Sequence, residues 1–154
     1  MNNRVKKIEK DVAKMVGGKR CVGSGNQWFE KSDVQSDVVQ IEVKTTQKYK
    51  DVVILKRMWI SKLMREVQNT SRYPVLVLVS KSRRYFLVMK MVLNLVGMNV
   101  SCDRVVDMSI RKSIVVDDYN IGYKLGSHIW VCMCEDDFMK VYNKLKAFSN
   151  RDGQ

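Results

Sequence analysis

Two carboxylates and one ammonium group near residue 40 have a spacing suited to chemistry on a phosphate ester. Glu42 and Lys44 are two residues apart in the run from Val38 to Lys44, so both side chains would lie on one face of a β-strand. Asp33 precedes Glu42 by nine residues and could fold back beside it across a tight turn. Mg²⁺ is usually held by one or two carboxylates together with substrate phosphate. The spacing therefore predicts metal-assisted phosphodiester hydrolysis, in which Lys44 orients the attacking water or stabilises developing charge.

The strand that would position these groups alternates between apolar and polar residues. The apolar residues Val39, Ile41 and Val43 would face the core. The polar residues Gln40, Glu42 and Lys44 would form the site. Asp37 is an alternative to Asp33 as the acidic residue before the strand. We favour Asp33, because Asp37 falls at the expected turn, where Asp is common for backbone reasons alone.

A helix near the start of the chain would carry a further carboxylate. Apolar residues at helical spacing predict a helix from Arg4 to Val16. Glu9 would lie on the edge of its buried stripe, and Asp11 would point well away. A carboxylate at that edge needs a partner, and the ordinary one would be Lys6 or Lys14.

Several motifs occur in an order that resembles the PD-(D/E)XK nuclease superfamily. They are Gly23-Ser24-Gly25, Lys31-Ser32-Asp33-Val34, Ile41-Glu42-Val43-Lys44-Thr45-Thr46 and Tyr73-Pro74-Val75-Leu76-Val77-Leu78. Within that superfamily the chain is similar to small phage-encoded nucleases related to archaeal Holliday-junction resolvases, over roughly residues 4 to 80. It departs from the pattern at Ser32, where a Pro often precedes the Asp, and in a short spacer between Asp and Glu. The resemblance implies an α/β fold, with a mixed central β-sheet of about five strands flanked by α-helices in a restriction-endonuclease-like nuclease core.

The resemblance also implies roles for individual residues. Glu9, Asp33 and Glu42 would be ligands of Mg²⁺, or of Mn²⁺, with Lys44 completing the catalytic set. Ser24 would belong to a functional loop that approaches a phosphate, although a plain connection between elements is equally consistent with a lone Gly-Ser-Gly.

Other residues near these motifs are candidates for contacts with DNA. They are Asn26 and Trp28 beside the small-residue loop, and Lys48, Lys50, Lys56 and Arg57 after the strand. The cations would hold flanking phosphates without sequence preference, and Trp28 would stack on exposed bases. Packing over the hairpin is an alternative for Trp28, and we expect half of the four cations to lie on a solvated helix edge.

Composition limits the kind of protein and of partner. The 154 residues include 28 Lys and Arg against 16 Asp and Glu, a net charge of +12, which indicates an anionic partner such as nucleic acid. The length favours one nuclease domain over residues 1–154, with an insertion at about 97–128 and a disordered tail at about 149–154. The chain shows no signal peptide, no apolar stretch that could span a membrane and no disulfide framework in its four Cys, so we expect a cytoplasmic protein.

Two classes of function fit these features. The first is a metal-dependent endonuclease that resolves four-way DNA junctions as a homodimer, in which two copies of the site cut symmetrically placed strands. Within this class, cleavage of flaps, mismatches or single strands is an alternative. The second class is a non-catalytic, basic nucleic-acid-binding module whose acidic hairpin is a structural ion-pair cluster. Three carboxylates where phosphate must approach favour the nuclease class.

Overall fold

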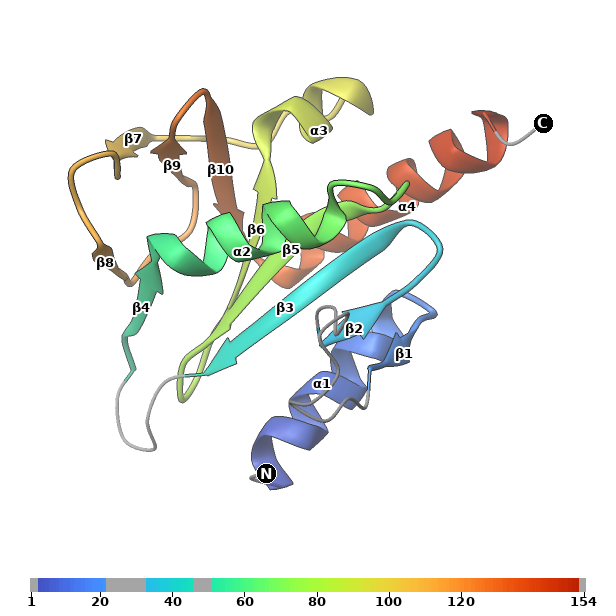
Figure 1. Cartoon of the computed structure of the whole chain (residues 1–154), viewed down its shortest axis with the longest axis horizontal. Coiled ribbons are helices and arrows are strands. Elements are labelled where there is room, and N and C mark those ends of the chain that lie inside the picture. Colours follow the sequence, from blue (N-terminus) through green and yellow to red (C-terminus); the bar gives the residue numbers. More distant parts are fainter. Residues whose placement is uncertain (1–2, 22–32, 46–50, 153–154) are drawn as a thin grey trace.

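A computed structural model describes residues 3–21, 33–45 and 51–152 (Figure 1). Its helices are α1 (Asn3–Met15), α2 (Arg57–Val67), α3 (Lys90–Leu95) and α4 (Glu135–Asp152). Its strands are β1 (Lys19–Arg20), β2 (Val34–Gln35), β3 (Val39–Thr45), β4 (Val53–Lys56), β5 (Tyr73–Val79), β6 (Arg84–Met89), β7 (Arg104–Asp107), β8 (Ser113–Val116), β9 (Ile121–Leu125) and β10 (His128–Met133). The chain is therefore an α/β protein, as the sequence predicts.

The main sheet is mixed and has eight strands, in the order β1-β2-β3-β5-β6-β10-β9-β7. Strands β3 and β5 are parallel, as are β7 and β9, and the other neighbours are antiparallel. The expectation of about five strands was wrong, because residues 97–128 supply β7 and β9, which extend the sheet beyond β10. The short strands β1 and β2 widen the opposite side. The same 97–128 region also supplies β8, which pairs with β4 in a separate two-stranded sheet.

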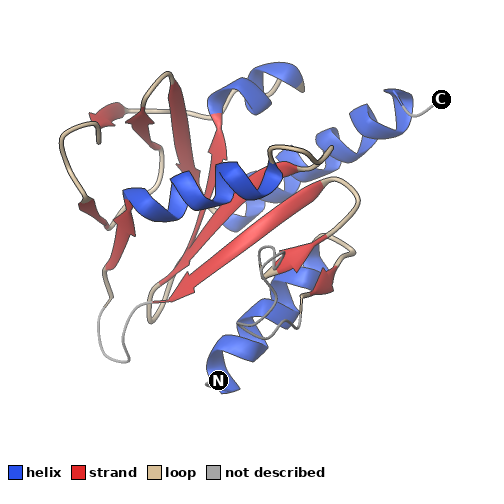
Figure 2. Ribbon diagram, viewed as in Figure 1, coloured by secondary structure: helices blue, strands red, loops and turns tan. Residues whose placement is uncertain are grey.

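Helices cover both faces of the central strands. Helix α2 crosses in front of the sheet in Figure 1 and contacts β5, whereas α4 lies behind the sheet and contacts β6. Figure 2 shows the same layers, with the red sheet between blue helices. Burial on both faces suits the parallel pair β3 and β5, whose residues from Val39 to Val43 and from Pro74 to Val79 are all buried. The polar face of β3 is thus enclosed near its start, where Gln40 is fully buried.

Helix α4 holds the back of the sheet together. Its apolar stripe of Phe138, Val141, Tyr142 and Leu145 is buried, and the Phe138 ring stacks on Phe86 with centroids 4.7 Å apart. The hydroxyl of Tyr142 donates a hydrogen bond to the carbonyl of Val16, just after α1, at 2.5 Å. These contacts fix the end of α1 relative to the sheet and so help to place Glu9.

Two predicted elements are confirmed, with small shifts at their ends. The helix predicted from Arg4 to Val16 forms as α1, and the strand predicted in the run from Val38 to Lys44 forms as β3. Helix α4 continues to Asp152, so residues 149–152 are helical where the sequence predicted a disordered tail. All four Cys are free thiols. Among the described residues, no helix combines the length and the apolar character needed to cross a membrane.

Candidate active site

The candidate site is built on the hairpin formed by β2 and β3. Its turn is fixed by Ser36, whose hydroxyl accepts hydrogen bonds from the backbone N–H groups of Val38 and Val39, each at 3.1 Å. Asp37 is exposed at this turn. Strand β2 pairs with β3 only through Val34, opposite Ile41, and Gln35, opposite Gln40. Beyond Ile41 the edge of β3 has no strand partner on this side among the described residues.

Asp33 immediately precedes β2, just beyond the last residue pair between β2 and β3. Its Oδ2 atom accepts a hydrogen bond of 2.8 Å from the backbone N–H of Val43, so the side chain takes the place of the missing strand. The Asp33 backbone carbonyl accepts another from the Cys21 N–H at 2.8 Å. These two bonds hold the Asp33 carboxylate against the edge of β3, in the middle of the candidate site.

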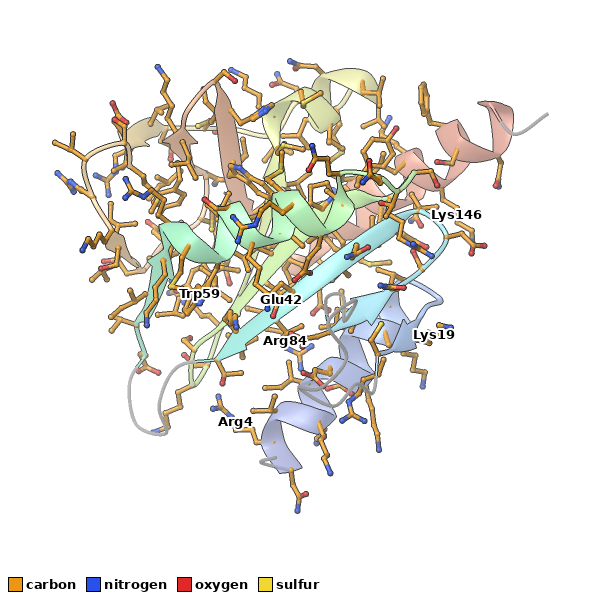
Figure 3. All side chains as sticks on the ribbon, viewed as in Figure 1. Arg4, Lys19, Glu42, Trp59, Arg84 and Lys146 are labelled. Carbon is orange, nitrogen blue, oxygen red and sulfur yellow. The ribbon has the colours of Figure 1, made fainter. Side chains whose placement is uncertain are left out.

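Glu42 is the most perturbed carboxyl group of the site. It is 6 % exposed, on the part of β3 that lies near α2 (Figure 3). Burial raises its pKa, the charge of Asp33 raises it further, and together they bring it to about 8 against the ordinary 4.5, despite the opposing charges of Lys44 and Lys62. A hydrogen-bonding interaction with Asp33 acts in the same direction. Two acidic groups that share one site in this way favour either a shared proton or a cation.

Glu9 reaches Asp33 from the other side. It is 3 % exposed on α1, and its Oε1 atom accepts a 2.7 Å hydrogen bond from Arg20 Nε. Burial raises the pKa of Glu9, Arg20 lowers it, and both the charge of Asp33 and a hydrogen bond with it raise it. The expectation that Glu9 lies at the edge of the buried stripe is confirmed. Its ion-pair partner is Arg20 on β1, not Lys6 or Lys14.

Lys44 lies beside Glu42 and is held by an aromatic ring that the sequence did not reveal as part of the site. Its Nζ atom is 3.5 Å from Glu42 Oε1 and 5.4 Å from the ring centroid of Trp59 on α2. The Nζ atom of Lys56 is 5.5 Å from the same centroid. Lys56 and Trp59 are three residues apart, a spacing that indicates a contact between them, but no local pattern indicates the contact of Trp59 with Lys44.

The donor set partly fits a divalent cation. The paired acidic groups of Asp33 and Glu42 match the one or two carboxylates that usually hold Mg²⁺, and a cation would offset the charge that burial disfavours on Glu42. Glu9 is close to Asp33 but is already paired with Arg20. In the described ranges, no group of three or more His, Cys, Asp or Glu side chains has an arrangement that could hold a metal ion.

The residues predicted to contact DNA fall into two groups. Lys56 is exposed beside Trp59, while Arg57 is used within the fold, because its Nη1 donates to the Ser109 carbonyl at 2.8 Å. The backbone N–H of Arg57 also donates to the Lys112 carbonyl. The other predicted positions lie outside the described residues; they are Ser24, Asn26, Trp28, Lys48 and Lys50.

Comparisons of the chain with protein-family models, with curated proteins and with solved structures found no significant match. The likeness to PD-(D/E)XK nucleases therefore depends on the motif residues themselves.

Proposed function

We propose that the protein is a metal-dependent nuclease of the PD-(D/E)XK type. The observation that carries the proposal is the position of Asp33, whose carboxylate raises the pKa of both Glu9 and Glu42 while Lys44 lies 3.5 Å from Glu42. A purely structural ion-pair cluster would alternate opposite charges. The paired carboxyl groups of Asp33 and Glu42 at the edge of a strand, with Glu42 at a pKa of about 8, instead suit a site that takes up a cation.

Each residue would have a distinct role. Asp33 and Glu42 would hold the cation, and Glu9 would support them from α1, balanced by Arg20. A bound Mg²⁺ or Mn²⁺ would supply a nucleophile by lowering the pKa of water, and it would offset negative charge on the phosphate. Lys44, positioned by Trp59, would hydrogen-bond the attacking water or the phosphate oxygens.

We further propose that the substrate is branched DNA, specifically a four-way junction cut by a homodimer. The support is the resemblance of the motifs to junction-resolving nucleases and the net charge of +12, which suits a large polyanion. Two symmetrically placed cuts in a junction call for two copies of the site, which is the reason to propose a dimer.

The test is cleavage of a labelled four-way junction beside matched linear duplex, flap and single-strand substrates, with Mg²⁺ or with EDTA. The informative variants are Glu42→Gln and Asp33→Asn, which remove charge but keep the side-chain shape. Asp37→Asn is the matched control, because Asp37 is an exposed acidic residue of the same hairpin. We expect metal-dependent paired nicks from the wild type and from Asp37→Asn, and a loss of at least about a hundredfold in the other two.

The results separate the alternatives. Preferential cleavage of flaps or single strands would support the nuclease proposal and overturn the proposal that a four-way junction is the substrate. Binding without cleavage under Mg²⁺ and Mn²⁺ would leave the non-catalytic binding module, a reading favoured by the bonds of Asp33 to Val43 and of Glu9 to Arg20. Loss of activity in Asp37→Asn but not in Asp33→Asn would transfer the ligand role to Asp37.

A further inference from the structure

A strongly basic cavity, separate from the candidate active site, lies between α1 and the turn that joins β5 to β6. It has a volume of about 350 Å³. Its lining contains five cationic side chains and one carboxylate; the cations are Arg4, Lys7, Lys81, Arg83 and Arg84, and the carboxylate is that of Asp11. The two parts of the wall come from segments that are almost seventy residues apart in the sequence. The fold therefore gathers positive charge here that no local sequence run contains.

The contacts within this cavity leave much of its positive charge uncompensated. Arg84 is neutralised, since its Nη2 lies 3.1 Å from Asp11 Oδ2 and its Nη1 lies 3.5 Å from Glu135 Oε1. Arg4 and Arg83 donate to backbone carbonyls, of Ser80 and Asp117 respectively. Among the described residues, Lys7 and Lys81 take part in no ion pair, and both are exposed.

The cavity lies at the same end of the sheet as Lys44. In the parallel pair β3 and β5, Glu42 is opposite Leu76 and Thr45 is opposite Val79, and Val79 lines the cavity. The three residues from Glu42 to Thr45 span about 10 Å along a strand. A bond of 3.2 Å from Ser82 Oγ to Asp51 Oδ1 also ties the rim of the cavity to the chain that follows β3.

The two sites lie on opposite edges of α1. On a helical projection the cavity residues Arg4, Lys7 and Asp11 fall within one sector, and Glu9 lies well outside it, across the buried stripe. In Figure 3, Arg4 and Arg84 both lie between α1 and the sheet end, below Glu42. Glu42 lies on the face of the sheet that carries α2, whereas Arg84 lies on the same face as Phe86, which stacks on α4. A nucleic acid would therefore reach both sites by passing around this end of the sheet.

We propose that this basic cavity binds backbone phosphates of the nucleic acid whose strand passes the Glu42 site. The proposal rests on the proposed function in taking the ligand to be that nucleic acid. Lys7 and Lys81 are the phosphate contacts, and Arg4 is held by Ser80 as a fixed part of the wall. Such contacts fix the register of the polymer without reading its sequence. Phosphate is the appropriate chemical class, because a small cavity lined by cations and hydroxyl groups offers donors and little apolar surface.

The experiment measures binding of a labelled four-way junction, in EDTA, over a series of salt concentrations. The test variant is Lys7→Gln/Lys81→Gln. The matched control is Lys144→Gln/Lys146→Gln, which removes the same charge from exposed positions on α4. Each phosphate contact contributes about 0.9 to the slope of log affinity against log salt concentration. We expect the test variant to bind about tenfold more weakly at 0.1 M salt and to lose between about one and two units of slope, whereas the control changes little.

The outcomes distinguish this inference from the nuclease proposal. Equal losses of affinity and slope in the two double variants would show that net charge alone matters, and would overturn the cavity as a site. If the test variant alone loses affinity and slope but the wild type never cleaves DNA, the cavity is supported as a binding site and the nuclease proposal is rejected. If the test variant binds normally and the wild type shows metal-dependent cleavage, the cavity is rejected and the nuclease proposal stands. Thermal unfolding of both variants checks that each is folded. We expect little change in the melting temperature, because neither Lys7 nor Lys81 makes an ion pair within the described residues.

Discussion

The carboxylate of Asp33 accepts a hydrogen bond from the backbone N–H of Val43, at 2.8 Å. This one side chain binds the backbone of β3 just beyond the residues that pair with β2, and it also raises the pKa of Glu42 and of Glu9. Asp33 thus has a backbone role that does not need its charge and an electrostatic role that depends on it. Substitutions that remove the charge, with or without the hydrogen-bond acceptor, separate the two.

We predict that Asp33→Asn is more stable than Asp33→Ala by about 1 kcal/mol in the absence of metal. Both changes relieve the repulsion among the carboxylates, but the Asn side-chain carbonyl can still accept from Val43. Urea unfolding in EDTA measures the difference. Equal stability of the two variants would mean that the bond to Val43 contributes nothing, whereas cleavage should be lost in both.

The core of this site was accessible from the sequence because its signals are local. The alternation from Val39 to Lys44 depends on a period of two, and the structure confirms Val39, Ile41 and Val43 as buried. The position of Glu9 on the edge of the buried stripe follows from the period of an α-helix, and the structure shows that its side chain is itself buried. Regular elements with one buried face leave such patterns in the chain.

The remaining features come from pairings between distant segments, which leave no pattern. Arg20 finds Glu9 across eleven residues, and Trp59 meets Lys44 only because α2 folds over β3. Strand β7 was missed for a related reason. The residues of β7 are mostly exposed at the edge of the sheet, so they show no apolar periodicity to identify them.

Trp59→Leu is expected to slow cleavage about two- to fivefold, because the indole ring holds Lys44 by a contact worth about 0.5–1 kcal/mol. Trp59→Phe should have a smaller effect, since a ring remains. Lys56→Gln is the control, because Lys56 contacts the same ring and has no contact with Glu42 among the described residues. Single-turnover rates at saturating enzyme measure the change. A slower rate in Lys56→Gln than in Trp59→Leu would contradict a positioning role for the ring.

Tyr142→Phe should lower the free energy of unfolding by about 1–2 kcal/mol without changing cleavage per folded molecule. The change removes the buried hydrogen bond from the Tyr142 hydroxyl to the Val16 carbonyl and leaves that acceptor unsatisfied. Chemical denaturation combined with an activity assay at low temperature tests both halves. A large loss of activity in the folded variant would show that the end of α1 must be fixed for catalysis.

The stability of the metal-free protein should fall as the pH rises from about 5 to about 8. Burial and Asp33 raise the pKa of Glu42 to about 8 from the ordinary 4.5, so in this range the folded protein binds more protons than the unfolded chain. Stabilisation by this group is complete below the unfolded pKa and is lost as the pH approaches 8, with a slope of at most about 1.4 kcal/mol per pH unit. The raised pKa of Glu9 acts in the same direction. Melting curves in EDTA should show a flatter dependence for Glu42→Gln, and a wild-type profile as flat as that of the variant would contradict the raised pKa.

Addition of Mg²⁺ or Mn²⁺ should reverse this loss at pH 8. A cation that binds the folded protein alone stabilises it by about 2.7 kcal/mol at a concentration one hundred times its dissociation constant. The effect should weaken towards pH 6, where Glu42 is mostly protonated and no longer offers a negative charge to the ion, and EDTA should abolish it. Glu42→Gln should show little stabilisation at either pH, whereas Asp37→Asn should behave like the wild type because Asp37 is exposed at the turn. Equal stabilisation of all three proteins would place the bound cation elsewhere on the surface, and it would remove the strongest physical reason for gathering Glu9, Asp33 and Glu42 at the edge of β3.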